Sequence, residues 1–540
     1  MSFHYTPFPR EEAERRWQRA LSVLPAALSW ALLGGLAVLS LTVPSAGAAL
    51  MIALLLYYVF RLVHNGIFLT ISFLRVRAEE KTDWIGRLSE LDSGADPSAP
   101  SASAPRGIAA RVHRSVLRAA REAGLELPRL DRLVHLVIIP ICNEPRSVWE
   151  PAVRALQSST LDPRRFLVVV LSVEERSAPG VIEEARALRE LYRSRFRDFL
   201  VLVHPAGLPG EIPGKGSNVG WAARGLTGYL AERSISFADA ILSCIDADAL
   251  VSPQYFACLS YYFLAEPRRT RSCFQPLPVF SNNIWRVPAL IRVVEMGATV
   301  LQLIDSTSTE LLVTFSCYSY SFEALAESGF WPPDVIAEDA AVFWKTFLHF
   351  RGDFRAVPIP VTVHMDAAEG PTFLRAIRNA YRQKLRWAYG AENLATVLRG
   401  VFRHGLVRGR RRWTTVLKLV ENSVSMTSWP FILSVFSWAP QLYNLLSNTS
   451  PLAMFNLGRI SAVIFMLSGA FLALLVLVTG FFAYRASAGA PLLKKILYPL
   501  EWLVVLPFAS MLFGGAAALH AQTRLAVGKP LAYVVMEKIR

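Results

Sequence analysis

The stretch that decides the fold is Ala240-Ile-Leu-Ser-Cys-Ile-Asp246-Ala-Asp248-Ala-Leu-Val251. An apolar run leads directly into two carboxylates, which predicts a buried strand over 240–245 with Asp246 and Asp248 at its carboxyl end. Open α/β sheets bind ligands at that edge. Paired carboxylates there suit Mg²⁺ or Mn²⁺, which can in turn hold the phosphates of a substrate. An Asp-x-Asp alone is a weak signal, because turns and helix caps also use aspartate.

The segments before this stretch alternate between predicted strands and predicted helices. Strands are expected over 134–139, 166–172 and 199–204, and helices over 148–158, 181–195 and 218–232. This alternation predicts a doubly wound α/β domain with a parallel sheet. No Gly-x-Gly-x-x-Gly follows the first strand and no Gly-x-x-x-x-Gly-Lys-Ser/Thr occurs, so dinucleotide-binding and P-loop sites are disfavoured.

Apolar runs flank this α/β region on both sides. Of the 540 residues, 53% are hydrophobic and only 18% are charged, which indicates a membrane-embedded part. Runs long enough to span a membrane cover 21–43, 48–74, 419–446, 460–484 and 497–519. The net charge is +15, and many of the basic residues lie next to these runs. That placement is typical of cytosolic flanks facing anionic lipid, so nucleic acid is not an expected partner.

The apolar runs and the basic residues predict different topologies for the C-terminus. Five spans would place it outside, whereas Arg524, Lys529, Lys538 and Arg540 indicate an inside position. Either the last run is re-entrant or interfacial, or one of the other runs is not a span. All five cysteines fall in the central region without metal-like spacing, which favours reduced thiols in a cytosolic domain.

Six short motifs follow one another between residues 140 and 387. They are Pro140-x-x-Asn143-Glu144, Lys215-x-x-Asn218, Asp246-Ala-Asp248, Ser316-Cys317, Glu338-Asp339 and Gln383-x-x-Arg386-Trp387. In this order, with membrane segments on both sides, they resemble the motifs of the membrane-integrated family-2 glycosyltransferases, which include cellulose, chitin and hyaluronan synthases. The resemblance covers roughly residues 130–390. It implies a GT-A-type nucleotide-sugar-binding domain inserted between N- and C-terminal transmembrane helices.

The resemblance implies a role for each motif. Asp248 would hold the metal ion, and Asp246 would assist it or contact the ribose or the donor sugar. Lys215 and Arg386 would be fixed cations for the diphosphate. Asp339, beside Glu338, would take the proton of the acceptor hydroxyl, and direct attack would invert the anomeric centre. Other expected contacts are to the nucleotide sugar from Pro140, Glu144 and Glu174, and to the acceptor or diphosphate from Cys317, Gln383 and Trp387.

Three features depart from the family pattern. Tyr318 follows Ser316-Cys317 where the family's acceptor-loop Phe-Cys-Gly has glycine. Glu174 and Glu175 stand where the family has an Asp that contacts uridine, which leaves the nucleotide open. The C-terminal Tyr533-Val-Val-Met536-Glu-Lys538 resembles the family's gating loop Phe-x-Val-Thr-x-Lys, with Met536 in place of Thr. A gating loop must reach a cytosolic active site, and this resemblance therefore favours a C-terminus on the inside.

Several of these residues also have a purely structural explanation. Asp339 could cap a helix that starts near Ala340, and Trp387 could pack at a membrane interface. Cys317 alone would most simply be a core residue. Lys215 lies between Gly214 and Gly216, and a flexible glycine loop gains nothing structurally from a lysine, which favours a functional role.

The sequence therefore predicts a multi-pass membrane protein whose cytosolic domain is a metal-dependent, inverting glycosyltransferase. The expected donor is a nucleotide sugar, with UDP-sugars first, and the expected product is a polysaccharide threaded across the membrane. One alternative is transfer to a lipid acceptor, and another is a membrane scaffold or transporter with an inactive domain. The predicted regions are a cytosolic lead-in (1–20), a transmembrane hairpin (21–74), a basic and disordered linker with a surface helix (75–130), the glycosyltransferase domain (131–390), an interfacial basic helix (391–418), transmembrane or interfacial helices (419–520) and a gating-like tail (521–540).

Overall fold

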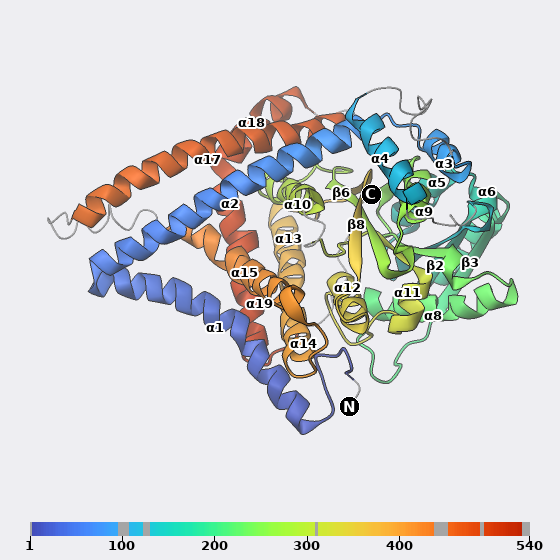
Figure 1. The fold of residues 1–540 in the computed structure, drawn as a ribbon, viewed down its shortest axis with the longest axis horizontal. Coiled ribbons are helices and arrows are strands. Elements are labelled where there is room, and N and C mark those ends of the chain that lie inside the picture. Colours follow the sequence, from blue (N-terminus) through green and yellow to red (C-terminus); the bar gives the residue numbers. More distant parts are fainter. Residues whose placement is uncertain are drawn as a thin grey trace.

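The computed structural model describes residues 3–94, 107–122, 130–307, 312–436, 452–486 and 491–531. Its catalytic-domain candidate is built on an eight-stranded sheet in the order β3-β2-β1-β4-β7-β6-β8-β5 (Figure 1). The strands are β1 (Val134–Ile141), β2 (Leu167–Glu174), β3 (Asp198–His204), β4 (Ala240–Cys244), β5 (Leu250–Val251), β6 (Ser272–Phe280), β7 (Tyr318–Ser321) and β8 (Arg355–Met365).

The half of the sheet formed by β1 to β4 is parallel, as the alternation of strands and helices predicts. Side chains of β1 alternate between two cores, because successive residues of a strand point to opposite faces. Val137 and Ile139 pack under helices on one face, and Leu136 and Ile138 pack under helices on the other. The first face is covered by α5 (Arg146–Gln157), α7 (Val181–Tyr192) and α9 (Tyr255–Ala265), and the second by α8 (Lys215–Glu232), α11 (Phe322–Ser328) and α12 (Glu338–His349).

The other half of the sheet is mixed, so the parallel order does not extend across the whole domain. β7 runs antiparallel to both β4 and β6, while β6 and β8 pair in parallel. The register of β6 against β8 shifts between Gln275 and Leu277. Pro276 lies at this shift, and a proline cannot donate a ladder hydrogen bond, which accounts for the irregularity.

Four helices in the described part of the chain are long and apolar enough to cross a membrane: α1 (Glu12–Thr42), α2 (Pro44–Glu79), the Ala462–Arg485 part of α17 (Leu452–Arg485), and a continuous helix over Leu492–Ala526. In Figure 1 they lie beside the sheet domain, and α1, α2 and α17 project away from it. Large apolar side chains stay exposed on them, for example Phe60 at 81% and Leu492 at 71%. Such surfaces suit contact with lipid.

The apolar run at 419–446 is not among these four helices. Its first part belongs to α15 (Gly409–Ser434), and its last part lies outside the described residues. Residues 391–418 contain α14 (Ala391–Phe402) and the start of α15. An even number of spans would place both ends of the chain on one side, in agreement with the basic C-terminal residues.

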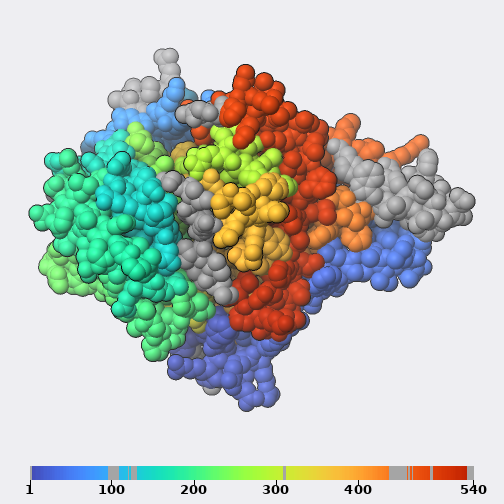
Figure 2. All heavy atoms as spheres, turned by 180° about the vertical axis from the view of Figure 1, so that it is seen from behind, coloured from blue at the N-terminus to red at the C-terminus, as the bar shows by residue number. Residues whose placement is uncertain are grey.

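The last apolar helix connects the membrane-facing helices to the sheet domain. It consists of α18 (Leu492–Ala509), a π-helical segment (Ser510–Ala516) and α19 (Ala517–Ala526). α19 packs against α13 (Phe373–Ala388), with Leu385, Ala518 and Leu525 in a shared apolar cluster. Figure 2 shows this contact from behind, where the golden surface of the α13 region lies against the red C-terminal helices.

Candidate active site

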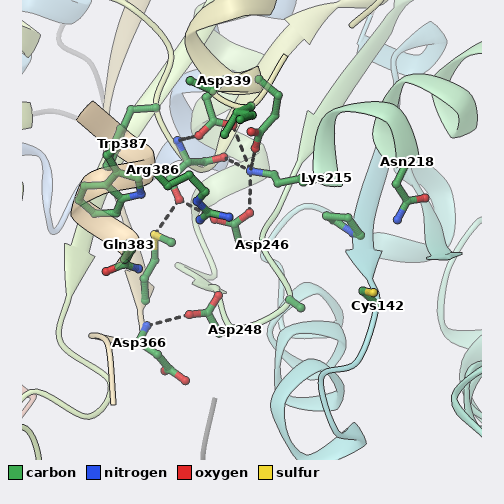
Figure 3. Close-up of a pocket in the computed structure, with 18 of the residues that line it drawn as sticks. Cys142, Lys215, Asn218, Asp246, Asp248, Asp339, Asp366, Gln383, Arg386 and Trp387 are labelled. Atoms are coloured by element: carbon green, nitrogen blue, oxygen red, sulfur yellow. Dashed lines mark hydrogen bonds and ion pairs between the residues drawn. The ribbon is translucent and has the colours of Figure 1, made fainter. Parts of the chain in front are cut away.

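The carboxyl ends of β1, β2, β4 and β8 meet the amino ends of α8 and α12 and one face of α13 at a single pocket (Figure 3). Most of the side chains singled out in the sequence line it, although the roles assigned to them remain predictions. These residues are Pro140, Glu144, Glu174, Lys215, Asp246, Asp248, Glu338, Asp339, Gln383, Arg386 and Trp387.

At the centre of the pocket, Lys215 is surrounded by three carboxylates. Its Nζ lies 2.8 Å from Oδ1 of Asp246, 3.1 Å from Oδ1 of Asp339 and 3.3 Å from Oε1 of Glu338. Burial alone would lower the pKa of Lys215, but the attraction of Asp246 and Asp339 outweighs it and holds that pKa well above its usual value. Lys215 is therefore a permanent cation at this position.

The pKa of Asp339 is also raised, which favours the neutral form of this carboxyl. Burial and the neighbouring charge of Glu338 raise the pKa of Asp339 to about 8, although the Lys215 cation opposes this shift. A carboxyl whose pKa lies near neutrality can accept a proton from a substrate more readily than an ordinary aspartate. The helix α12 begins at Glu338 after Ala337, and no side chain caps it. Asp339 instead accepts a hydrogen bond from the backbone N–H of Ser316, so it does not act as the helix cap.

Ser316 also belongs to the site. Its place in the Ser316-Cys317 motif predicted no role for it. Its backbone N–H donates to Oδ2 of Asp339 at 2.8 Å, and its hydroxyl donates to Oδ2 of Asp246 at 2.6 Å. Its φ of +59° lies in the left-handed region, which is unusual for a residue other than glycine. Strained backbone of this kind is concentrated at functional sites. Ser316 thus links the carboxylate of β4's Asp-x-Asp to that of α12.

Asp248 lies on the floor of the pocket and is 1% exposed. Its Oδ2 accepts a hydrogen bond from the backbone N–H of Asp366, at the end of β8, at 3.1 Å. Asn282 also connects the two residues, because its Nδ2 donates to the backbone oxygen of Asp248 and to Oδ1 of Asp366. Asp366 was missed in the sequence, although a carboxylate directly after the apolar run of β8 resembles the pattern at β4.

Lys215 is the first residue of helix α8 and is not part of a flexible glycine loop, which corrects the placement expected from the sequence. Gly216 is required for this arrangement, since an added Cβ there would lie 2.8 Å from Cβ of Glu338. Asn218, the last residue of the Lys-x-x-Asn motif, is 1% exposed and exchanges hydrogen bonds with Ser172 of β2. It fixes α8 to the sheet and so fixes the position of Lys215.

Helix α13 forms the wall of the pocket opposite α8, and it presents Gln383, Arg386 and Trp387. The indole of Trp387 packs edge-on against Phe315, with ring centroids 5.1 Å apart, and lies 5.8 Å from the ring of Phe280. Trp387 therefore belongs to the pocket in this structure. Oε1 of Gln383 is buried and has no hydrogen-bond partner in the described part of the chain, which leaves an acceptor available to a ligand.

One comparison relates part of the chain to a known family. Residues 241–485 match the family model described as Glycosyl transferase family group 2. The matched region belongs to the family 2 glycosyltransferases. It extends from β4 to the end of α17, and so includes Asp246, Asp339 and α13 of the pocket but not Lys215 or the residues of β1 and β2. No curated protein matches this chain.

Solved structures of several glycosyltransferases show a distant likeness to this chain. The mannosyltransferase PcManGT from Pyrobaculum calidifontis, in complex with GDP-Man and Mn²⁺, has a TM-score of 0.41 at 17% identity and covers 71% of this chain and 93% of its own. TarS (1–349) from S. aureus with UDP-GlcNAc has a TM-score of 0.30 at 13% identity, covering 61% and 91%. GalNAc-T7 with UDP, GalNAc and Mn²⁺ has a TM-score of 0.29 at 12% identity, covering 59% and 58%.

Two groups of predicted residues lie outside this pocket's lining. Cys317 is fully buried behind it, and its Sγ accepts a hydrogen bond from the backbone N–H of Asp246 at 3.4 Å. All five cysteines are buried and free, as expected for reduced thiols. The gating-like residues Tyr533 and Lys538 lie outside the described residues.

The donors at the Asp-x-Asp motif suit a hard divalent cation. Among the described residues, no cluster of three or more His, Cys, Asp or Glu side chains could hold a metal ion. Asp246 and Asp248 offer carboxylate oxygens, which Mg²⁺ and Mn²⁺ prefer. Mg²⁺ is commonly held by one or two carboxylates together with substrate phosphates and water. The residues present therefore fit an ion that arrives with a diphosphate.

Proposed function

We propose that this membrane-associated glycosyltransferase moves a sugar from a nucleotide sugar to an acceptor hydroxyl, with inversion at the anomeric carbon. The observation that carries the proposal is the meeting of Lys215, Asp246 and Asp339 in one pocket, between Asp248 on the floor and Arg386 on the wall. This arrangement supplies both requirements of the reaction, which are cations for a leaving diphosphate and a base for the attacking hydroxyl.

The leaving nucleoside diphosphate carries about two to three negative charges, and preorganised cations stabilise such charge as it develops. Lys215 and Arg386 would bind the diphosphate oxygens, Arg386 with a guanidinium suited to two-pronged contact. A divalent ion at Asp248 and Asp246 would add Lewis-acid stabilisation to the same oxygens. Pro140, Glu144 and Glu174 line the nucleotide end of the pocket in this proposal.

The acceptor hydroxyl must lose its proton as it attacks the sugar. Asp339 would accept that proton, since its raised pKa of about 8 keeps it basic enough to do so. Glu338 would keep that pKa high by its charge. The rings of Trp387 and Phe315 form an apolar wall on which the face of an acceptor sugar can stack.

We further propose that the acceptor is a growing polysaccharide that leaves through the membrane. The support is the position of Arg386 and Trp387 on α13, which packs directly on α19 of the last apolar helix. Transfer of one or two sugars to a lipid is the alternative, and product length separates the two. UDP-sugars are the donors we expect first.

The test is the release of nucleoside diphosphate by purified protein from UDP- and GDP-sugars, with Mg²⁺ or Mn²⁺ and membrane lipid present. Wild type should release it from one donor, and Asp339→Asn should bind that donor equally well while turnover falls by about 10²–10⁴-fold. Normal turnover by Asp339→Asn would overturn the assigned base. Release from no donor would support an inactive domain.

A further inference from the structure

The segment that precedes α1 lies on the sheet domain. Residues 3–9, which we call the N-terminal strap, pack against the core on the α8 and α12 side of the sheet. Tyr5 is 8% exposed, and Phe3 packs against the same cluster. Chain ends are poorly ordered unless specific contacts tie them down. Such contacts are present at three successive residues of the strap.

Helix α14 holds the backbone of the strap. The hydroxyl of Tyr5 donates to Oδ1 of Asn393 at 2.8 Å. Nη2 of Arg399 donates to the backbone oxygens of His4 and Thr6, at 2.9 and 3.0 Å. The side chain of Arg399 is 1% exposed, so water does not compete for these hydrogen bonds.

The side chain of Thr6 contacts the loop that leads into the proposed catalytic helix. Its hydroxyl donates to Oδ2 of Asp334, which lies four residues before Glu338. The other oxygen of this carboxyl, Oδ1, is buried and has no hydrogen-bond partner within the described residues. Burial raises the pKa of Asp334, which shows that its charge is poorly solvated. The Thr6 hydroxyl is therefore important for keeping this carboxyl in place.

The loop over 331–337 contacts the segment before Lys215 and leads directly into the helix that carries Asp339. The backbone oxygen of Pro333 accepts a hydrogen bond from the N–H of Ile212, in the segment that leads to Lys215. The next helix places Cβ of Glu338 where it would meet a Cβ on Gly216 at 2.8 Å. Because these contacts leave so little space, a shift of the loop would displace the start of α12 relative to α8.

We infer that the N-terminal strap is a positioning element of the active site, in which Thr6, acting through Asp334, sets the placement of Asp339 against Lys215. Neither Thr6 nor Asp334 lines the pocket, so both are positioning residues. The inference rests on the proposed function for its link to turnover. It also gives the N-terminal strap, which precedes α1, a role in the reaction.

The test compares variants of Thr6 in the full-length protein. Thr6→Val keeps the shape of the side chain and removes the donor, whereas Thr6→Ser keeps the hydroxyl. Thr227→Val is the matched control, because the exposed Thr227 hydroxyl contacts only the backbone oxygen of Arg224 in its own helix. Thr6→Val should lower kcat by about 10- to 100-fold, as expected for a base displaced by about 1 Å. Its Kd for the nucleotide sugar should stay within about twofold of wild type, and Thr6→Ser and Thr227→Val should retain kcat.

Hydrogen exchange of the backbone provides a readout that does not depend on turnover. In Thr6→Val, the backbone amides over 331–341 should exchange faster than in wild type, and those of β1 and β2 should exchange at the wild-type rate. The other two variants should match wild type throughout. If wild type shows no turnover, the proposed function fails, and the exchange result still decides the role of the strap. Unchanged exchange in Thr6→Val overturns the inference. So does a parallel loss of donor binding and of protection throughout the domain, which would mean that Thr6 is needed only for folding.

Discussion

Nζ of Lys215 lies 3.1 Å from Oδ1 of Asp339, so the proposed cation for the diphosphate and the proposed base for the acceptor belong to one ion cluster. Asp246 shares the same ammonium at 2.8 Å. The side chain of Lys215 is 12% exposed, and water therefore does little to replace a missing partner. The properties of each member of the cluster consequently depend on the others.

Removal of the Lys215 charge should destabilise the protein in a pH-dependent way. Lys215→Met would leave three carboxylates close together, at a cost of about 3–5 kcal/mol near pH 8. Without the cation, the pKa of Asp339 would rise further above its value in the unfolded chain, so the native state would bind more protons than the unfolded state. Stability would then fall as the pH rises, and the loss would be smaller at pH 6 than at pH 8. Unfolding temperatures at the two pH values check this, with the exposed Lys81→Met as the control.

The pH profile of turnover should report Asp339. Because burial and Glu338 raise its pKa to about 8, kcat/KM should rise with pH and reach half of its maximum near pH 8. Glu338→Gln removes one negative charge beside Asp339 and should move this rising limb to lower pH. A limb that stays in place in Glu338→Gln would mean that another group governs it.

Asp248 should be needed for the effect of metal on donor binding. In wild type, Mg²⁺ or Mn²⁺ should tighten the binding of the nucleotide sugar, as measured by calorimetry with and without the ion. Asp248→Ala should lose most of this difference and retain the metal-free affinity. Asp339→Asn should keep the difference. Equal metal dependence in wild type and Asp248→Ala would contradict the assignment.

The ion pair behind Trp387 should be structural and separable from the chemistry. Nζ of Lys384 lies 2.7 Å from Oε2 of Glu295, which is fully buried, and 3.4 Å from the centre of the Trp387 indole. Lys384→Met should cost about 3–5 kcal/mol, because it leaves a buried carboxylate unpaired. The double variant Lys384→Met with Glu295→Leu should recover most of this loss in unfolding experiments. A double variant as unstable as the single one would show that the charge is not the cause.

The elements that could be predicted from the sequence are those with a local signal. The strands β1 to β4 have apolar runs of strand length, and all six motifs contribute residues to the lining of one pocket. The mixed half of the sheet could not be predicted in this way. β7 pairs antiparallel with β4 and β6, and the pairing of β6 with β8 is interrupted by a register shift. This part of the chain therefore has no regular alternation of strands and helices.

The contacts that organise the site are long-range, and spacing along the chain does not reveal them. Lys215 and Asp339 are 124 residues apart, and Thr6 and Asp334 are 328 residues apart. The left-handed backbone of Ser316 is equally hidden, because serine has no sequence preference for that conformation. A carboxylate after an apolar strand was the one available signal for Asp366.

The helix over Leu492–Ala526 is longer than a membrane is thick. Its 35 residues extend over about 50 Å, compared with about 30 Å for the hydrocarbon core of a bilayer. A bilayer that holds the apolar part of this helix would leave α19 outside, where it packs against the helix that presents Arg386 and Trp387. A change in acyl-chain length would tilt or shift this helix and move the acceptor wall relative to Asp339. The thickness of the surrounding lipid would then be a determinant of the reaction rate.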